Sequence, residues 1–84
     1  MKLFVIQEFV KYHDLDLCLK SEETSLSFAS SHYKDKKPLI MFNASLYEIM
    51  EAIKETDLTL EAYNGAIHLF DRDCNAEVGF LVEG

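Results

Sequence analysis

Residues 58–70 read LTLEAYNGAIHLF, and this stretch decides the fold because two alternating segments flank Asn64 and Gly65. Asn-Gly is the strongest two-residue hairpin signal, since both central positions of a type I′ turn need a positive φ. A turn at this point places Glu61 opposite His68 across two antiparallel strands. One face of the hairpin then carries only apolar side chains and is predicted to face the core. These are Leu58, Leu60, Ala62, Ile67 and Leu69.

A helix is predicted immediately before the hairpin, over about 45–56. Ser45 and Glu48 have the spacing of a capping box, in which each side chain accepts a hydrogen bond from the other residue's backbone N–H. Beyond them, apolar residues fall at i, i+3, i+4 and i+7, the spacing of a stripe that faces a core. This stripe consists of Leu46, Ile49, Met50 and Ile53. The β-branched Thr56 and the following Asp57 mark the predicted end of the helix.

Four further segments outside the hairpin are predicted to be strands. Residues 3–10 are rich in Val, Ile and Phe, and residues 14–20 alternate apolar and polar side chains, so we expect these two segments to pair as a hairpin. Residues 39–42, after Pro38, and residues 76–83 are the other two. In the last of these strands, three side chains are expected to point inward: Val78, Phe80 and Val82.

Two segments in the first half are less regular. Residues 21–33 fit either a strand or a short helix, because apolar residues recur at both spacings, and we favour a strand. Residues 34–38 are expected to form a solvated turn with three lysines beside one aspartate. A single Arg and a net charge of −7 do not favour a nucleic-acid-binding face around this turn.

The order of predicted elements indicates an α+β fold, because antiparallel hairpins dominate and helical crossovers do not recur. We expect an antiparallel sheet of five or six strands, with one α-helix at about 45–56 packed on one face. The 84 residues, 49% of them hydrophobic, predict a single globular domain over 1–84. The apolar run at 3–6 is shorter than the roughly 7–15 residues of a signal peptide or the roughly 20 of a membrane span. We therefore expect a cytoplasmic protein with no membrane partner.

The formal net charge of −7 lies entirely in the second half of the chain. Residues 1–44 carry six acidic and six basic side chains, whereas residues 45–84 carry nine acidic and two basic ones. Such a segment repels nucleic acid and anionic membrane and attracts basic partners. Glu51 and Glu55 are like charges at i, i+4, which disfavours the helix slightly, and a binding role would explain them. The predicted partner-binding residues are Glu48, Glu51, Glu55, Asp57 and Glu61.

This charge distribution predicts a small non-enzymatic interaction protein or inhibitor. We expect it to dock on a basic protein, such as a nucleic-acid-binding one, without binding nucleic acid directly. In size and charge the chain is similar to phage- or plasmid-encoded anti-defence proteins, such as anti-CRISPR or anti-restriction proteins, and to antitoxin or immunity proteins, although no motif identifies such a family. The alternative is a structural module that forms a homodimer through an exposed apolar sheet face. The residues of that alternative interface are Tyr63, Phe70 and Leu81.

No motif predicts a catalytic, cofactor or metal site. Asp71, Asp73 and Asn75 match the first positions of a calcium loop. However, Ala76 and Val82 stand where that loop needs Gly and Glu, so we expect an ordinary turn. The three histidines also lack the spacing of zinc ligands.

The remaining polar candidates have simple structural interpretations. Cys18 and Cys74 are distant in the sequence and lack Cys-x-x-Cys spacing, so we expect both thiols to be reduced and buried. Glu61 and His68 are expected to form a cross-strand surface pair and not a catalytic acid–base pair.

Overall fold

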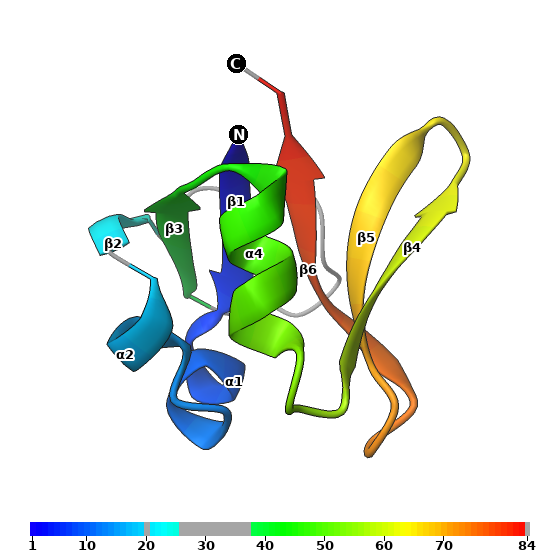
Figure 1. Ribbon diagram of the computed structural model, residues 1–84, viewed down its shortest axis with the longest axis horizontal. Helices are drawn as coiled ribbons and strands as arrows, with labels where there is room; N and C mark the ends of the chain where they lie inside the picture. Colours follow the sequence, from blue (N-terminus) through cyan, green and yellow to red (C-terminus); the bar gives the residue numbers. More distant parts are fainter. Residues whose placement is uncertain (20, 26–37, 84) are drawn as a thin grey trace.

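The computed structural model of the chain describes residues 1–19, the backbone of 21–25 and residues 38–83. Within these residues the strands form one antiparallel sheet in the order β2-β3-β1-β6-β5-β4 (Figure 1). Together with three short helices, the sheet confirms the predicted α+β class. The strands are β1 (Lys2–Ile6), β2 (Ser21–Ser25), β3 (Leu39–Asn43), β4 (Leu58–Tyr63), β5 (Ala66–Asp71) and β6 (Ala76–Val82). The helices are α1 (Gln7–Tyr12), α2 (Leu15–Cys18) and α4 (Leu46–Ile53).

The segment predicted over 21–33 is described only in part. Its first residues form β2, an edge strand that pairs with β3, in line with the strand that the sequence favours. Residues 26–33 and the lysines of the predicted turn at 34–37 lie outside the described residues.

The N-terminal segment does not form the predicted hairpin. β1 ends at Ile6, and the chain continues as α1 and α2. Both edges of β1 are occupied, by β3 on one side and β6 on the other, so that no edge is left for a strand at 14–20. Leu15 and Leu19, four residues apart, are buried, whereas Leu17 is 80% exposed. The burial follows the spacing of a helix, and the strand prediction for this segment is wrong.

The central hairpin has the predicted register. Asn64 and Gly65 adopt positive φ angles of 51° and 75°, as the two-residue turn requires. β4 and β5 pair along their full length, with Glu61 opposite His68. Of the five residues predicted to face the core, Leu58 and Leu69 are buried on the face that α4 covers, and Leu60 and Ile67 pack against them. Ala62 is exposed, contrary to the prediction.

α4 lies over β1 and β6 (Figure 1) and begins at the predicted capping box. There Ser45 and Glu48 exchange hydrogen bonds of 3.0 and 3.1 Å. The helix ends at Ile53 and not near residue 56, because the Thr56 hydroxyl donates to the Ile53 carbonyl at 2.7 Å and accepts from the Leu58 N–H at 3.1 Å. These bonds turn the chain directly into β4.

Only half of the predicted apolar stripe of α4 faces the core. Ile49 and Ile53 are buried against the sheet, whereas Leu46 and Met50 are exposed. Tyr47, Glu48, Glu51 and Ala52 line a pocket with Cys18 of α2, so helical spacing places Leu46 and Met50 on the other flank of α4. The fully buried sheet residues that share the core with the helix are Leu3, Val5, Phe42, Leu69 and Val78.

β6 contains a bulge that changes the predicted direction of its side chains. Its register with β5 shifts by one residue at Val78, so that Val78 and Leu81 both lie in the core under α4. Phe80 and Val82 point to the opposite face, contrary to the prediction. There Phe80 stacks on Phe4 with ring centroids 5.1 Å apart.

The sheet face away from α4 carries a second buried cluster. It consists of Phe4, Ile6, Leu39 and Met41, with Phe80 packed against it. Close approach of β1 and β6 requires Gly79, because a Cβ at this position would lie 2.5 Å from the Phe4 carbonyl oxygen. β1 is therefore buried on both faces and paired on both edges, as the central strand of the fold.

Candidate functional site

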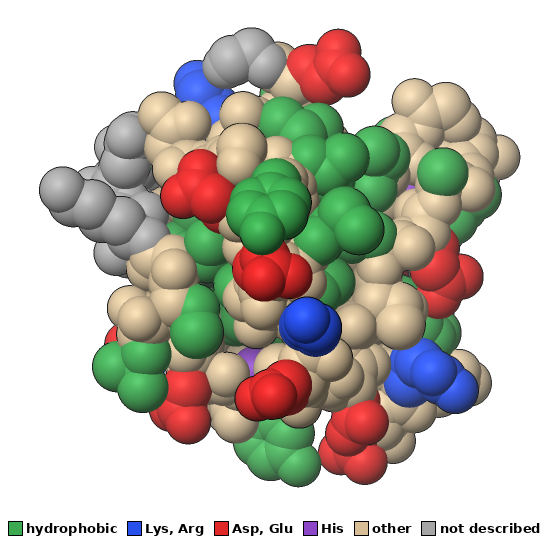
Figure 2. Space-filling model, viewed as in Figure 1, with side chains coloured by type: hydrophobic (Ala, Val, Ile, Leu, Met, Phe, Trp, Pro, Cys, Tyr) green, Lys and Arg blue, Asp and Glu red, His purple; other side chains and the backbone are tan. Residues whose placement is uncertain are grey.

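The outward face of α4 carries aromatic and apolar side chains among carboxylates. Tyr47 is 72% exposed and Met50 is 54% exposed, and Glu51 beside them also meets solvent. Figure 2 shows apolar and acidic side chains over this helix, with the apolar groups extending toward β6 and the hairpin. Large apolar side chains gathered on a surface and rimmed by charge are typical of protein-binding sites.

A pocket of about 340 Å³ lies between α2 and α4. Tyr47, Glu48 and Glu51 line it from α4, and Cys18 lines it from α2. Cys18 is exposed, contrary to the prediction of a buried thiol, because it lies on the short helix and not on a half-buried strand. The pocket presents two carboxylates and a phenol, which suits the charged donors of Lys or Arg.

The structure brings only some of the five predicted acids together. Glu48 and Glu51 share α4, and Glu55 follows in the turn after it, so the Glu51–Glu55 pair is not on a regular helix. Asp57 is exposed just before β4. Glu61 lies on the opposite face of the sheet from α4, because it alternates with the core residues of β4.

The carboxylates near α4 differ in whether they already form hydrogen bonds within the chain. The Ser45 N–H, and then the Ser45 hydroxyl, hold the pKa of Glu48 below its ordinary value through the capping box. Glu51 and Glu55, by contrast, make no side-chain hydrogen bond or ion pair in the described part of the chain. These two carboxylates, like that of the exposed Asp57, are therefore available to a partner.

The three residues of the alternative interface do not form one surface. Leu81 is 8% exposed in the core under α4, on the other side of the sheet from Tyr63 and Phe70. The bulge in β6 explains the difference, because it turns Leu81 inward. Phe70 is half-buried, and Tyr63 is exposed.

A cluster of Tyr63, His68 and Glu77 crosses β4, β5 and β6 on the face away from α4. His68 is buried and not on the surface as predicted, and its Nδ1 lies 2.7 Å from a Glu77 oxygen. Tyr63 stacks on the imidazole with centroids 4.0 Å apart and donates a hydrogen bond to Glu77. This hydrogen bond, together with burial and the Glu77 charge, raises the pKa of Tyr63 to about 12. The phenol stays neutral and ties the hairpin to β6.

A second pair joins the N-terminal helices to the turn between β5 and β6. His13 Nε2 lies 2.9 Å from Asp71 Oδ2, and both side chains are buried. Burial raises the pKa of Asp71, but hydrogen bonds from His13 and the Asp73 N–H outweigh it, so this pKa lies below its ordinary value. Cys74 is also exposed, contrary to the prediction of a buried thiol. Partial desolvation, and then the Asp71 carboxylate, raise the pKa of this thiol, the opposite of what a nucleophilic cysteine needs.

Tyr47 and Met50 are the site residues that the sequence pattern did not reveal. Met50 fits the apolar stripe at i+4 from Leu46, so periodicity assigns it to the core. The sequence feature that could have revealed this site is Tyr47, an aromatic residue on the helix but outside the apolar stripe.

Comparisons of the chain with protein-family models, with curated proteins and with solved structures found no match. Among residues 1–19 and 38–83, no group of three or more His, Cys, Asp or Glu is arranged to hold a metal ion. None of the described helices has the length and apolar character that crossing a bilayer requires.

Proposed function

We propose that this chain is a non-enzymatic interaction protein that docks the outer face of α4 on a basic protein partner. The observation that supports it most is the exposure of Tyr47 and Met50 among the carboxylates of α4. Aromatic residues and Met are enriched in protein interfaces, and Tyr often contributes much of the affinity. A partner that covers these two side chains removes their apolar surface from water, which favours binding.

The charge of the chain supports a basic partner. The net charge is −7, and the carboxylates of Glu51 and Glu55 are available near α4. Such a surface attracts a cationic protein over a distance and repels nucleic acid. A nucleic-acid-binding protein has this chemistry, because its own binding face is basic. The role that follows is that of a cytoplasmic inhibitor, of the anti-defence type, which covers that face.

Two matched charge reversals test this surface. Glu51→Lys and Glu61→Lys change the net charge equally, but Glu51 lies on α4 and Glu61 on the opposite sheet face. A partner captured from source cells at low salt and identified by mass spectrometry is purified and titrated by calorimetry. We expect Glu51→Lys to weaken binding at least about tenfold, or about 1.4 kcal/mol, and Glu61→Lys to weaken it less than about threefold.

Salt dependence and folding provide the controls. The affinity should fall steadily as the salt concentration rises from about 50 to about 300 mM, because the attraction is screened. Circular dichroism and the Tm of both variants establish that each remains folded. Equal losses from the two reversals, or an affinity that does not depend on salt, would contradict docking through α4.

A further inference from the structure

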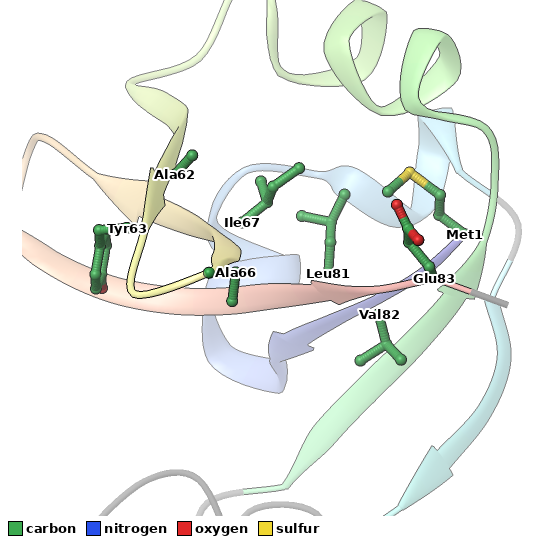
Figure 3. Close-up of a pocket in the computed structure, with 9 residues that line it drawn as sticks. Met1, Ala62, Tyr63, Ala66, Ile67, Leu81, Val82 and Glu83 are labelled. Carbon is green, nitrogen blue, oxygen red and sulfur yellow. The ribbon is translucent and has the colours of Figure 1, made fainter.

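β5 and β6 separate toward one end of the sheet and leave a cleft between them. Their pairing ends at His68↔Phe80, the last pair at that end among the described residues, and the strands diverge beyond it (Figure 1). A cleft of about 680 Å³ opens there (Figure 3). We call it the β5–β6 cleft; its two strand walls are Ala66 and Ile67 of β5 and Leu81 and Val82 of β6.

Contacts on both sides of β6 mark the point where the two strands part. On the face away from α4, Tyr63 stacks on His68, which forms the last pair with β6, and donates a hydrogen bond to Glu77. On the other side of β6, Leu81 and Val82 stay paired with β1. β6 therefore uses one edge within the sheet and turns its other edge toward the cleft.

The lining of the β5–β6 cleft suits an extended peptide. Met1, Ile67 and Leu81 point toward α4, whereas Ala66 and Val82 point away from it (Figure 3). An extended peptide also directs successive side chains to opposite faces, so its alternation matches that of the two walls. Strand edges supply main-chain donors and acceptors, the basis of recognition by strand addition.

The extended peptide could come from a partner or from a second copy of the chain, and charge favours the partner. Glu83 is the charged side chain that lines the cleft, and no Lys or Arg among the described residues lines it. A second copy would bring another net charge of −7, and two such copies repel each other. A segment that carries Lys or Arg is attracted to the same place.

We propose that the β5–β6 cleft receives an extended basic segment of the partner, which pairs as a strand with the cleft-facing edge of β6. This proposal rests on the proposed function, because the segment belongs to the basic protein that α4 docks. The segment places an apolar side chain against Ile67 and Leu81 and its cations near Glu83. Ile67 and Leu81, which line the cleft, also pack in the core under α4, so the cleft lies beside the helix.

A synthetic peptide tests the cleft without the partner. The probe is a peptide of alternating Lys and Val, about seven residues long and blocked at both ends, added to the isotope-labelled full chain in an NMR titration. We expect saturable shifts of the amides of Ala66, Ile67, Leu81 and Val82. The same peptide with alternate N-methyl groups, which removes main-chain donors, should bind at least about tenfold more weakly. A peptide of alternating Glu and Val should not bind.

Two variants at one position provide a matched pair. Ala62 lines the cleft and is exposed, so a longer side chain there leaves the core intact. Ala62→Arg should weaken the Lys–Val peptide at least about tenfold, and the uncharged Ala62→Gln less than about threefold. Both variants should keep the Tm of the parent chain.

The outcomes separate this inference from the proposed function. Peptide shifts confined to α4 would overturn the cleft proposal and leave docking through α4 in place. Chemical-shift changes at the cleft on addition of the peptide, together with a partner affinity that Glu51→Lys leaves unchanged, would support the cleft proposal and overturn docking through α4. Equal binding of the Glu–Val peptide, or cleft shifts that grow with the concentration of the chain alone, would overturn a basic occupant in favour of apolar contact or a second copy.

Discussion

The two ends of β5 are joined to their neighbours by similar groups in different surroundings. At one end the His13–Asp71 pair is almost fully buried and connects the N-terminal helices to the sheet. At the other end β5 leaves β6 just beyond His68, whose pair with Glu77 remains partly exposed. Each pair consists of a histidine and a carboxylate, so the two pairs differ in burial and not in chemistry. The buried pair fixes the junction between the N-terminal helices and the sheet, whereas the partly exposed pair lies at the boundary of the β5–β6 cleft.

Among variants at the two ends of β5, removal of the His13 side chain should have the largest effect on stability. His13→Ala leaves the Asp71 carboxylate, which is 1% exposed, without its imidazole partner. Loss of one member of a buried pair destabilises a protein by about 3 kcal/mol or more. Urea denaturation measures this loss in the free energy of unfolding. A change below about 1 kcal/mol would show that the junction does not depend on the pair.

Acid should act on the same junction. Because the folded-state pKa of Asp71 is lowered, its contribution to stability is present above the unfolded value of about 3.9 and is lost as the pH falls through the folded value. His13→Ala removes the main lowering influence and leaves burial, which raises the pKa. We therefore expect the acid-unfolding midpoint of His13→Ala to move to higher pH, as followed by circular dichroism. An unchanged midpoint would contradict this role of His13.

Removing the Tyr63 hydroxyl should have the smallest effect and a local one. Tyr63→Phe keeps the stack on His68 but loses the hydrogen bond to Glu77. We expect faster amide hydrogen exchange at Ala66 and Ile67, at the mouth of the cleft, and unchanged exchange in the paired part of β5. Exchange that quickens equally along the whole strand would show that the cluster holds the sheet and not only the boundary of the cleft.

Alkali provides a second measurement on this cluster. The folded-state pKa of Tyr63 is raised to about 12, so the neutral phenol is favoured in the fold. Its contribution to stability is therefore present below the unfolded pKa of about 10 and is lost as the pH rises toward 12. In Glu77→Gln, the Tyr63 titration should move back toward 10, as read from phenolate absorbance after subtraction of the Tyr63→Phe titration.

The elements that local signals determine were predictable from the sequence. Asn64 and Gly65 set the hairpin register by themselves, and Ser45 with Glu48 sets the start of α4. The segment 14–20 could not be placed in this way, because its structure depends on which strands occupy the edges of β1. The bulge in β6 is also a tertiary feature, since it appears only where β6 meets β5.

The candidate site shows the same division. The acidic charge of α4 was predictable from composition. The prediction that grouped Glu61 with the acids of α4 was wrong, although the alternation of β4 already places Glu61 on the other face of the sheet. The exposure of Met50 was not predictable, since the apolar spacing of α4 is the same whether or not another helix covers that flank. The cleft also lay beyond prediction, because it forms where two strands that share a sheet stop pairing.

β1 pairs with β3 and β6, and this position has a kinetic consequence for a chain that is made from its N-terminus. β1 completes its pairing only when β6 has been synthesised, so one edge of the central strand stays unpaired until then. Such distant pairings slow folding and prolong the exposure of apolar strand edges. We expect the nascent chain without β6 to be the species most dependent on chaperones.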